Sequence, residues 1–388
     1  MLKNITRTLW NFRPSGAFYF STHNINDAVE GEKSPFKTKL KNVDMSFETN
    51  KMYAAFPHIL EHLLEEQLSY HQQFTELKTT YSNLLNHTVN LEPQLIGKGI
   101  FTVYAYKMLE KPLLLTEDNI KKACVVGWCH KLMDASLTVD DDIFDSKERR
   151  YNKPTWYKVN GVGVNKAILD GAFLDAGIWF LLIKHLSSHK HFQAIMKQIL
   201  LTFATTNIAQ RIDMTKRKVA DLDKFVFTPK AYGIILPVLR TALFLANIDD
   251  KDAHAATENI SKDVTNFLKV ENDVNDVFDP LYPFNSIKEA YTDISEGKSS
   301  WLALQAYSRG TSAQKKLLEE NYGKNDEEAI QKCYDLFNDL NLKEVFMNYK
   351  EEFYNTTFLK IHKELPKILP KELFVDFLNL AMTKNFTI

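Results

Sequence analysis

Five aspartates lie between residues 132 and 150 of the chain. If this segment is helical, Asp134, Asp141 and Asp145 fall within a narrow stripe and Asp142 lies beside them. Carboxylates stacked one turn apart repel each other, so such a face is costly unless cations fill it. Ligand sets made only of oxygen suit Mg²⁺, which keeps several waters and accepts carboxylates together with substrate phosphates. The segment therefore predicts a magnesium site for a phosphate-bearing substrate.

Two arginines, Arg149 and Arg150, end the same segment. Their planar guanidinium groups can hold an anion through paired hydrogen bonds. The alternative interpretation is a solvated acidic helix end that is balanced by two arginines. The rest of this helix is apolar, which argues against a solvated surface without function as the place of these aspartates. We therefore expect Asp141, Asp145 and Arg150 to take part in catalysis.

Helices must position these groups. From about Phe47 onward, apolar residues recur at helical spacing, and almost no stretch alternates with a period of two. Only 13 of the 388 residues are glycine, which disfavours turn-rich β architectures. No linker, low-complexity block or repeat divides the chain. We expect an all-α fold with a single helical domain over residues 45–388.

The bulk composition narrows the partners and the compartment. A net charge of -1 argues against a general nucleic-acid binder, and no apolar run approaches the ~20 residues of a membrane span. Three irregularly spaced cysteines indicate reduced thiols in an intracellular compartment. Residues 1–44 form a leader whose first part is basic, rich in Ser and Thr, and free of acidic residues before Asp27. This composition is typical of a mitochondrial transit peptide, and the alternative is a disordered or partly docked tail on a cytoplasmic protein.

Several short motifs together resemble the isoprenyl diphosphate synthase superfamily, in particular its farnesyl diphosphate synthase-like members. They are VVGWCH at 125–130, DDIFD at 141–145, RR at 149–150, TWY at 155–157, TDI at 292–294, Lys298, SW at 300–301 and ENYG at 320–323. The resemblance implies the isoprenoid synthase fold, a helical bundle around a central cavity. It also implies a prenyl diphosphate substrate, three Mg²⁺ ions that Mn²⁺ can replace, and a homodimer.

The resemblance further implies which residues bind metal and diphosphate. The second metal motif of the family, DDxxD, reads NDVND at 272–276 in this chain. The implied metal ligands are Asp141, Asp142, Asp145, Asp213, Asn272, Asp273 and Asp276. The implied diphosphate contacts are Lys98, Arg149, Arg150, Gln210, Lys230, Lys269, Lys288 and Lys298, and Lys269 is also expected to act in catalysis.

This sequence lacks several of the basic residues that form the second substrate site of the family. A chain-elongating synthase binds isopentenyl diphosphate with basic residues and without metal. The loop that begins this site keeps Lys98 but lacks the arginine of the family, and the basic C-terminal tail is missing. Asp134 stands where the family has a glutamine, and a poorly solvated carboxylate repels a diphosphate by a few kcal/mol. We therefore predict that isopentenyl diphosphate is no longer a good substrate.

Small residues occupy the positions at which the family places the aromatic floor of its pocket. Leu137 and Ser136 stand four and five residues before Asp141, near Asp134. A floor of this kind leaves room for a C15 or C20 prenyl tail. Phe203 and Tyr232 are expected in the pocket wall, where aromatic faces stabilise a carbocation. The alternative is that these aromatic residues only pack in a helical core.

The main prediction is a class I terpene synthase, a carbon–oxygen lyase that ionises a C15 or C20 prenyl diphosphate with Mg²⁺ and releases a hydrocarbon. The alternative is a prenyltransferase that makes farnesyl or geranylgeranyl diphosphate from isopentenyl diphosphate. A third hypothesis is an inactive subunit that binds a catalytic partner. The retained aspartates at 141, 142 and 145 speak against that third hypothesis.

Overall fold

The structure is a computed structural model that describes residues 34–89, 97–150, 153–214, 219–220, 232–278 and 291–383. In this part of the chain nearly every element is a helix, and the exception is a pair of two-residue antiparallel strands. The prediction of an all-α helical bundle is confirmed. None of the described helices is long and apolar enough to cross a membrane.

The described α-helices run from α2 to α17. Their bounds are α2 (Pro35–Lys39), α3 (Ser46–Gln67), α4 (Thr75–Thr88), α5 (Gly97–Leu109), α6 (Glu117–Phe144), α7 (Gly163–Leu186), α8 (Phe192–Asp213), α9 (Tyr232–Leu245), α10 (Lys251–Phe278), α12 (Thr292–Glu296), α13 (Trp301–Arg309), α14 (Ser312–Asn321), α15 (Glu327–Asp339), α16 (Leu342–Glu364) and α17 (Lys371–Met382). Two 3₁₀ helices, η4 (Pro112–Leu114) and η5 (Trp156–Lys158), and the strands β1 (Arg149–Arg150) and β2 (Lys153–Pro154) complete the set.

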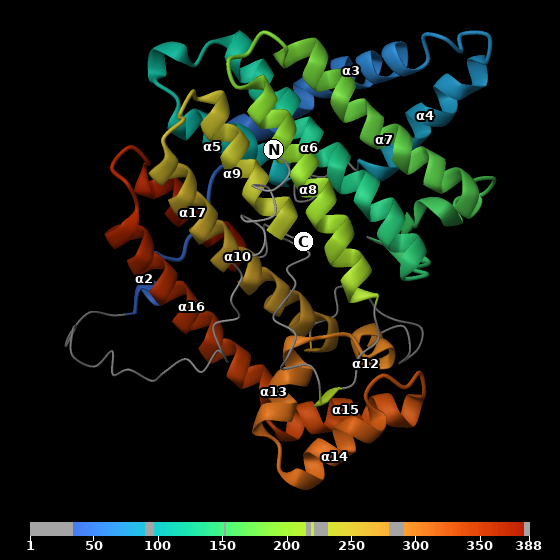
Figure 1. Ribbon diagram of the computed structural model, residues 1–388, viewed down its shortest axis with the longest axis vertical. Helices are drawn as coiled ribbons and strands as arrows, with labels where there is room; N and C mark the ends of the chain where they lie inside the picture. Colours follow the sequence, from blue (N-terminus) through green and yellow to red (C-terminus); the bar gives the residue numbers. More distant parts are fainter. Residues whose placement is uncertain are drawn as a thin grey trace, which may run out of the picture.

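Helix α6 is the central element. It packs against α3, α5, α7 and α9, and Figure 1 shows these helices gathered in one half of the molecule with α12–α15 in the other. Helix α10 contacts α9 in the first group and α12 and α13 in the second. The acidic ends of α6 and α10 are therefore brought to the region between the two groups.

Helices α5 and α6 touch through their backbones. Gly99 on α5 faces Gly127 on α6, and a Cβ on Gly99 would lie 2.8 Å from the Gly127 carbonyl oxygen. A Cβ on Gly127 would lie 2.7 Å from the Gly99 carbonyl oxygen. Contacts this short are not tolerated, so glycine is required on both sides of the crossing. The crossing brings the first turn of α5, which contains Lys98, against the middle of α6.

The predicted leader, residues 1–44, lies mostly outside the described residues. Its described end contacts the helical domain. The ring of Phe36 on α2 lies 5.5 Å from that of Tyr354 on α16, and the Phe36 N–H donates to Asn355 at 2.9 Å. Residues 34–36 thus pack against α16, whereas the transit-peptide assignment falls on residues outside the described ranges and stays a prediction.

Candidate active site between α6, α10 and α12

The C-terminal end of α6 folds back on itself. Helix α6 ends at Phe144, and Asp145 is its C-cap. Ser146 then adopts a left-handed conformation with φ 53°, its N–H donating to the Ile143 carbonyl at 3.2 Å. The Lys147 N–H donates to the Asp142 carbonyl at 2.9 Å, which completes a Schellman motif. This turn directs Lys147 back over the last turn of α6.

The carboxylates of this first acidic cluster are paired with basic side chains. The Lys147 Nζ lies 3.2 Å from an oxygen of Asp141 and 3.2 Å from an oxygen of Asp145. Arg150 on β1 donates at 2.8 Å to Asp141 through one guanidinium nitrogen and at 2.8 Å to the buried Asp142 through another. The predicted arginine, Arg150, is thus joined to the predicted aspartates, whereas Arg149 is exposed.

A second acidic cluster comes from α10 and α12. Asp273 is fully buried, and its oxygens accept hydrogen bonds from the Lys269 ammonium and, at 2.8 Å, from the Trp301 N–H at the start of α13. Asp276 lies one turn beyond Asp273 on α10. Asp293 on α12 is also buried, and its Oδ2 has no hydrogen-bond partner among the residues that the structure describes.

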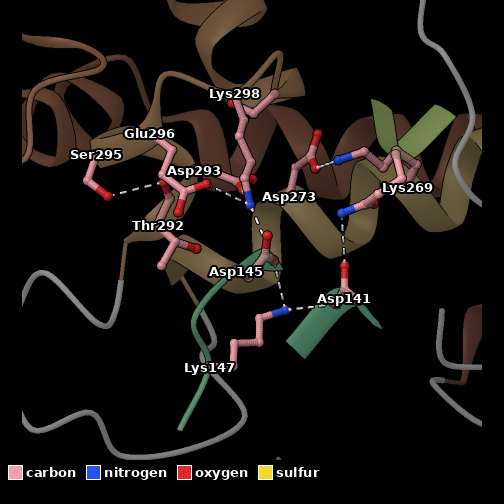
Figure 2. Close-up of polar contacts among 12 residues, drawn as sticks. Asp141, Asp145, Lys147, Lys269, Asp273, Thr292, Asp293, Ser295, Glu296 and Lys298 are labelled. Atoms are coloured by element: carbon pink, nitrogen blue, oxygen red, sulfur yellow. Dashed lines mark hydrogen bonds and ion pairs between the residues drawn. The ribbon is translucent and has the colours of Figure 1, made fainter. Parts of the chain in front are cut away.

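Lys298 joins the two acidic clusters. Its Nζ lies 3.6 Å from Asp145, 3.8 Å from Asp293 and 3.2 Å from Glu296 (Figure 2). Figure 2 shows Lys147 approaching the aspartates of α6 from the opposite side to Lys298. The predicted contact Lys298 therefore lies between the two acidic clusters, and its role in binding a diphosphate stays a prediction.

Burial and mutual repulsion perturb these groups strongly. Burial, followed by the charges of Asp293 and Asp273, raises the pKa of Asp276 to about 7. Burial raises the pKa of Asp273 to about 6, against the opposing charge of Lys269. Burial alone lowers the pKa of Lys147, but Asp141 and Asp145 outweigh it and the pKa is raised overall. The carboxylates of the two acidic clusters outnumber the four basic side chains that contact them.

The donor chemistry of the two clusters fits Mg²⁺. The available ligands are carboxylate oxygens, and the buried Oδ2 of Asp293, which accepts no hydrogen bond from the described residues, could accept a hard cation. Among the described residues, no three acidic, histidine or cysteine side chains already stand as a ligand shell. Asp141, Asp145 and Asp276 would hold the metal. The predicted number of three ions stays a prediction.

The other predicted ligands and contacts lie at varied places. Gln210 on α8 reaches Asp141 with its amide nitrogen at 3.4 Å, a long hydrogen bond. Asn272 is exposed on α10, in contrast to its neighbour Asp273. Lys230 and Lys288 lie outside the described residues, as do the side chains of Asp213 and Tyr232.

Two turns before the acidic end, α6 carries a second group of charges. The Lys98 Nζ donates to the two oxygens of Asp134 at 2.9 and 3.1 Å, and only 7% of Lys98 is exposed. Lys131, one turn before Asp134, is also buried, and this burial lowers its pKa to about 8. The charge of Arg150 acts on Lys131 as well. The negative charge of Asp134 is thus balanced by Lys98, and Lys131 adds a second positive charge.

The predicted pocket residues mainly make packing contacts in the described structure. The Ser136 hydroxyl donates to the Gly171 carbonyl of α7 at 3.0 Å. Leu137 is half-buried against the core. The Phe203 ring lies 6.4 Å from that of Trp179 and joins α8 to α7. Their role in chain-length selection stays a prediction.

Sequence reasoning did not single out four residues of this region. These are Lys131, Lys147, Asp293 and Glu296. Asp293 follows directly on Thr292 in a motif that was noted, so its acidic side chain was the available signal. Lys147 comes two residues after Asp145, but only the left-handed turn at Ser146 brings it back to the aspartates.

The chain matches known proteins over most of its length. A family described as polyprenyl synthetase matches residues 78–338. A farnesyl pyrophosphate synthase of Murgantia histrionica is 30% identical over 334 residues, covering 84% of this chain and 80% of that protein. One of Bos taurus is 29% identical over 312 residues, covering 77% of this chain and 86% of that protein. A solved structure, T. brucei farnesyl diphosphate synthase complexed with risedronate, shares the fold with a TM-score of 0.76 at 20% identity, covering 88% of this chain and 99% of that one.

These relatives correct one prediction. They are named as synthases of farnesyl pyrophosphate, which places them with the alternative prediction, the prenyltransferase. The prediction of a terpene synthase acting as a lyase is therefore wrong. The physical reason lies at Asp134, which we read as a lone carboxylate that repels a second diphosphate. The structure pairs it with Lys98, and Lys131 adds a further positive charge.

Proposed function

The chain belongs to the polyprenyl synthetase family, and on that premise we propose that it is a prenyltransferase that joins an allylic diphosphate to isopentenyl diphosphate. The allylic carbon–oxygen bond breaks and pyrophosphate leaves. A new carbon–carbon bond forms to the double bond of isopentenyl diphosphate, and one proton is lost. The names of the relatives favour farnesyl diphosphate as the product.

The observation that carries this proposal is the presence of two differently charged groups along α6, the second of which is completed by Lys98 of α5. The acidic end of α6 faces α10 and α12, and the Lys98, Lys131 and Asp134 group lies two turns earlier. Seven residues of helix separate Asp134 from Asp141, which is about 10 Å. This spacing suits one diphosphate held through metal beside a second held by basic side chains. A lyase with a single diphosphate substrate has no use for the second group.

Each charged side chain then has a role in the reaction. Mg²⁺, when bound, supplies the charge that polarises the allylic diphosphate. Lys298 and Arg150 contact the aspartates at the edge of the metal site and are placed to stabilise the departing pyrophosphate. In this proposal Lys98 and Lys131 hold the diphosphate of the second substrate and so orient its double bond.

The test is an assay of the purified full-length chain with Mg²⁺ and one allylic diphosphate of five, ten or fifteen carbons. Each reaction is run with and without radiolabelled isopentenyl diphosphate, and diphosphate and hydrocarbon products are separated. We expect a longer diphosphate only when both substrates are present. A hydrocarbon from the allylic substrate alone, with no incorporation of label, would contradict the proposal.

We further propose that two copies of the chain associate through α7 and α8. Exposed apolar residues lie near both ends of α7, and α8 adds others beside it, since the Trp179 and Phe203 rings join the two helices. The exposed large apolar side chains are Val164, Ile168, Leu169, Phe180 and Ile183 on α7 and Leu200, Leu201 and Ile208 on α8. Exposed apolar residues of this kind in a stable protein mark an association surface, and the superfamily resemblance implies a homodimer.

We expect the wild-type chain to sediment at twice its monomer mass of 44.9 kDa. The double substitution Ile168→Glu with Ile183→Glu should shift it to the monomer mass, because two charges per copy would be buried in the interface. Ile368→Glu, at an equally exposed isoleucine outside these helices, is the matched control and should remain dimeric. A dimeric double variant, measured by analytical ultracentrifugation, would place the interface elsewhere.

A further inference from the structure

Lys147 occupies the space between the two aspartates that end α6. Its ammonium is at the same distance, 3.2 Å, from an oxygen of Asp141 and an oxygen of Asp145. Its ammonium is therefore the shared counter-ion of the two carboxylates. One protein cation thus stands between the two carboxylates at the end of α6 (Figure 2).

The backbone holds this lysine in place. The left-handed turn at Ser146 and the hydrogen bond from the Lys147 N–H to the Asp142 carbonyl fix its Cα over the last turn of α6. A cation at the C-terminal end of a helix is also favoured by the helix dipole. Arg150 contacts the same oxygen of Asp141, and Lys298 the same oxygen of Asp145, but Lys147 alone of the three is paired with both aspartates.

We propose that the Lys147 ammonium takes the place of one divalent cation between Asp141 and Asp145, so that the chain binds a diphosphate with one fewer divalent ion than a variant with a neutral residue at 147. A divalent ion that bridged the two carboxylates would sit about 2 Å from each oxygen. It would overlap the ammonium, and two cations in direct contact repel. The inference rests on the proposed function, because it assumes a site for metal and diphosphate.

The experiment counts the ions. Wild type, Lys147→Met and Lys147→Arg are titrated with Mn²⁺ in the presence of inorganic pyrophosphate, and free Mn²⁺ is followed by electron paramagnetic resonance. Methionine keeps the length of the side chain without its charge, and arginine keeps the charge. We expect Lys147→Met to bind one more Mn²⁺ per chain than wild type, and Lys147→Arg to match wild type. Lys158→Met, at an exposed lysine paired with Glu148, is the surface control and should also match.

The same variants give a second measurement that does not depend on the count. Without metal, Asp141 and Asp145 lose their shared counter-ion in Lys147→Met, so its unfolding temperature should fall below that of Lys147→Arg. Added Mn²⁺ with pyrophosphate should then raise the unfolding temperature of Lys147→Met more than that of wild type. Lys147→Ser replaces the methionine variant if that variant does not fold.

Equal ion numbers in wild type and in the neutral variants would overturn the inference. If the ion numbers are equal and the wild-type chain elongates allylic diphosphates in the assay described above, the inference alone fails and the proposed function stands. If the wild type does not elongate them, the proposed function fails, and the ion count still decides the role of Lys147.

Discussion

Replacing Asp145 with alanine is expected to lower turnover by about a thousandfold, the range seen when a preorganised group that stabilises transition-state charge is lost. Asp145 contacts both Lys147 and Lys298 and faces α12, so its carboxylate is a shared element of the metal site and the pyrophosphate site. The change should also weaken Mn²⁺ binding. Both quantities can be measured on the same preparation, by turnover assay and by metal titration.

The fold should survive this change. The backbone N–H of Asp145, rather than its side chain, caps α6 by donating to the Asp141 carbonyl at 2.9 Å. Circular dichroism should therefore match that of wild type. Glu148→Ala removes the same charge three residues later, at an exposed pair with Lys158, and should leave turnover within about twofold of wild type. A fully active Asp145→Ala enzyme would exclude Asp145 as a metal ligand.

Replacing Lys98 with methionine should affect stability and the second substrate together. The substitution leaves the largely buried Asp134 without its counter-ion, which costs about 3 kcal/mol in the free energy of unfolding. It also removes a charge-assisted hydrogen bond to the diphosphate of the second substrate, so the KM for isopentenyl diphosphate should rise about tenfold or more. The KM for the allylic substrate should stay nearly constant.

A double variant separates the two effects. Lys98→Met with Asp134→Leu removes both charges, so stability should return close to that of wild type while the KM for isopentenyl diphosphate stays high. Asp134→Gln should act in the opposite sense: it frees Lys98 from its partner and should lower that KM. If the double variant recovers both stability and KM, then Lys98 serves only to hold Asp134.

The acidic stripe of α6 and the all-helical fold were predictable from the sequence because both depend on local spacing. Asp141, Asp145 and Arg150 do come together, as the helical period and the following arginines indicated. The partners of Asp273 were not predictable in the same way. The Trp301 N–H that donates to Asp273 lies 28 residues away in the chain, and the sequence of α10 contains no pattern that predicts this contact.

The error on function has the same origin. Asp134 was judged by its own charge, whereas Lys98, 36 residues earlier, determines what that charge does. Their pairing depends on how α5 crosses α6, which a single sequence does not reveal. Likewise, Lys147 reaches the aspartates only because a serine adopts a left-handed conformation that glycine usually takes.

The paired glycines at the crossing of α5 and α6 also restrict how these two helices can move against each other. Gly99 and Gly127 touch backbone to backbone, so no side chain between them can rearrange and let the helices slide. Lys98 and Asp134 are consequently carried on what behaves as one rigid body. Any closing movement of the enzyme around its substrates must then come from elements other than α5 and α6.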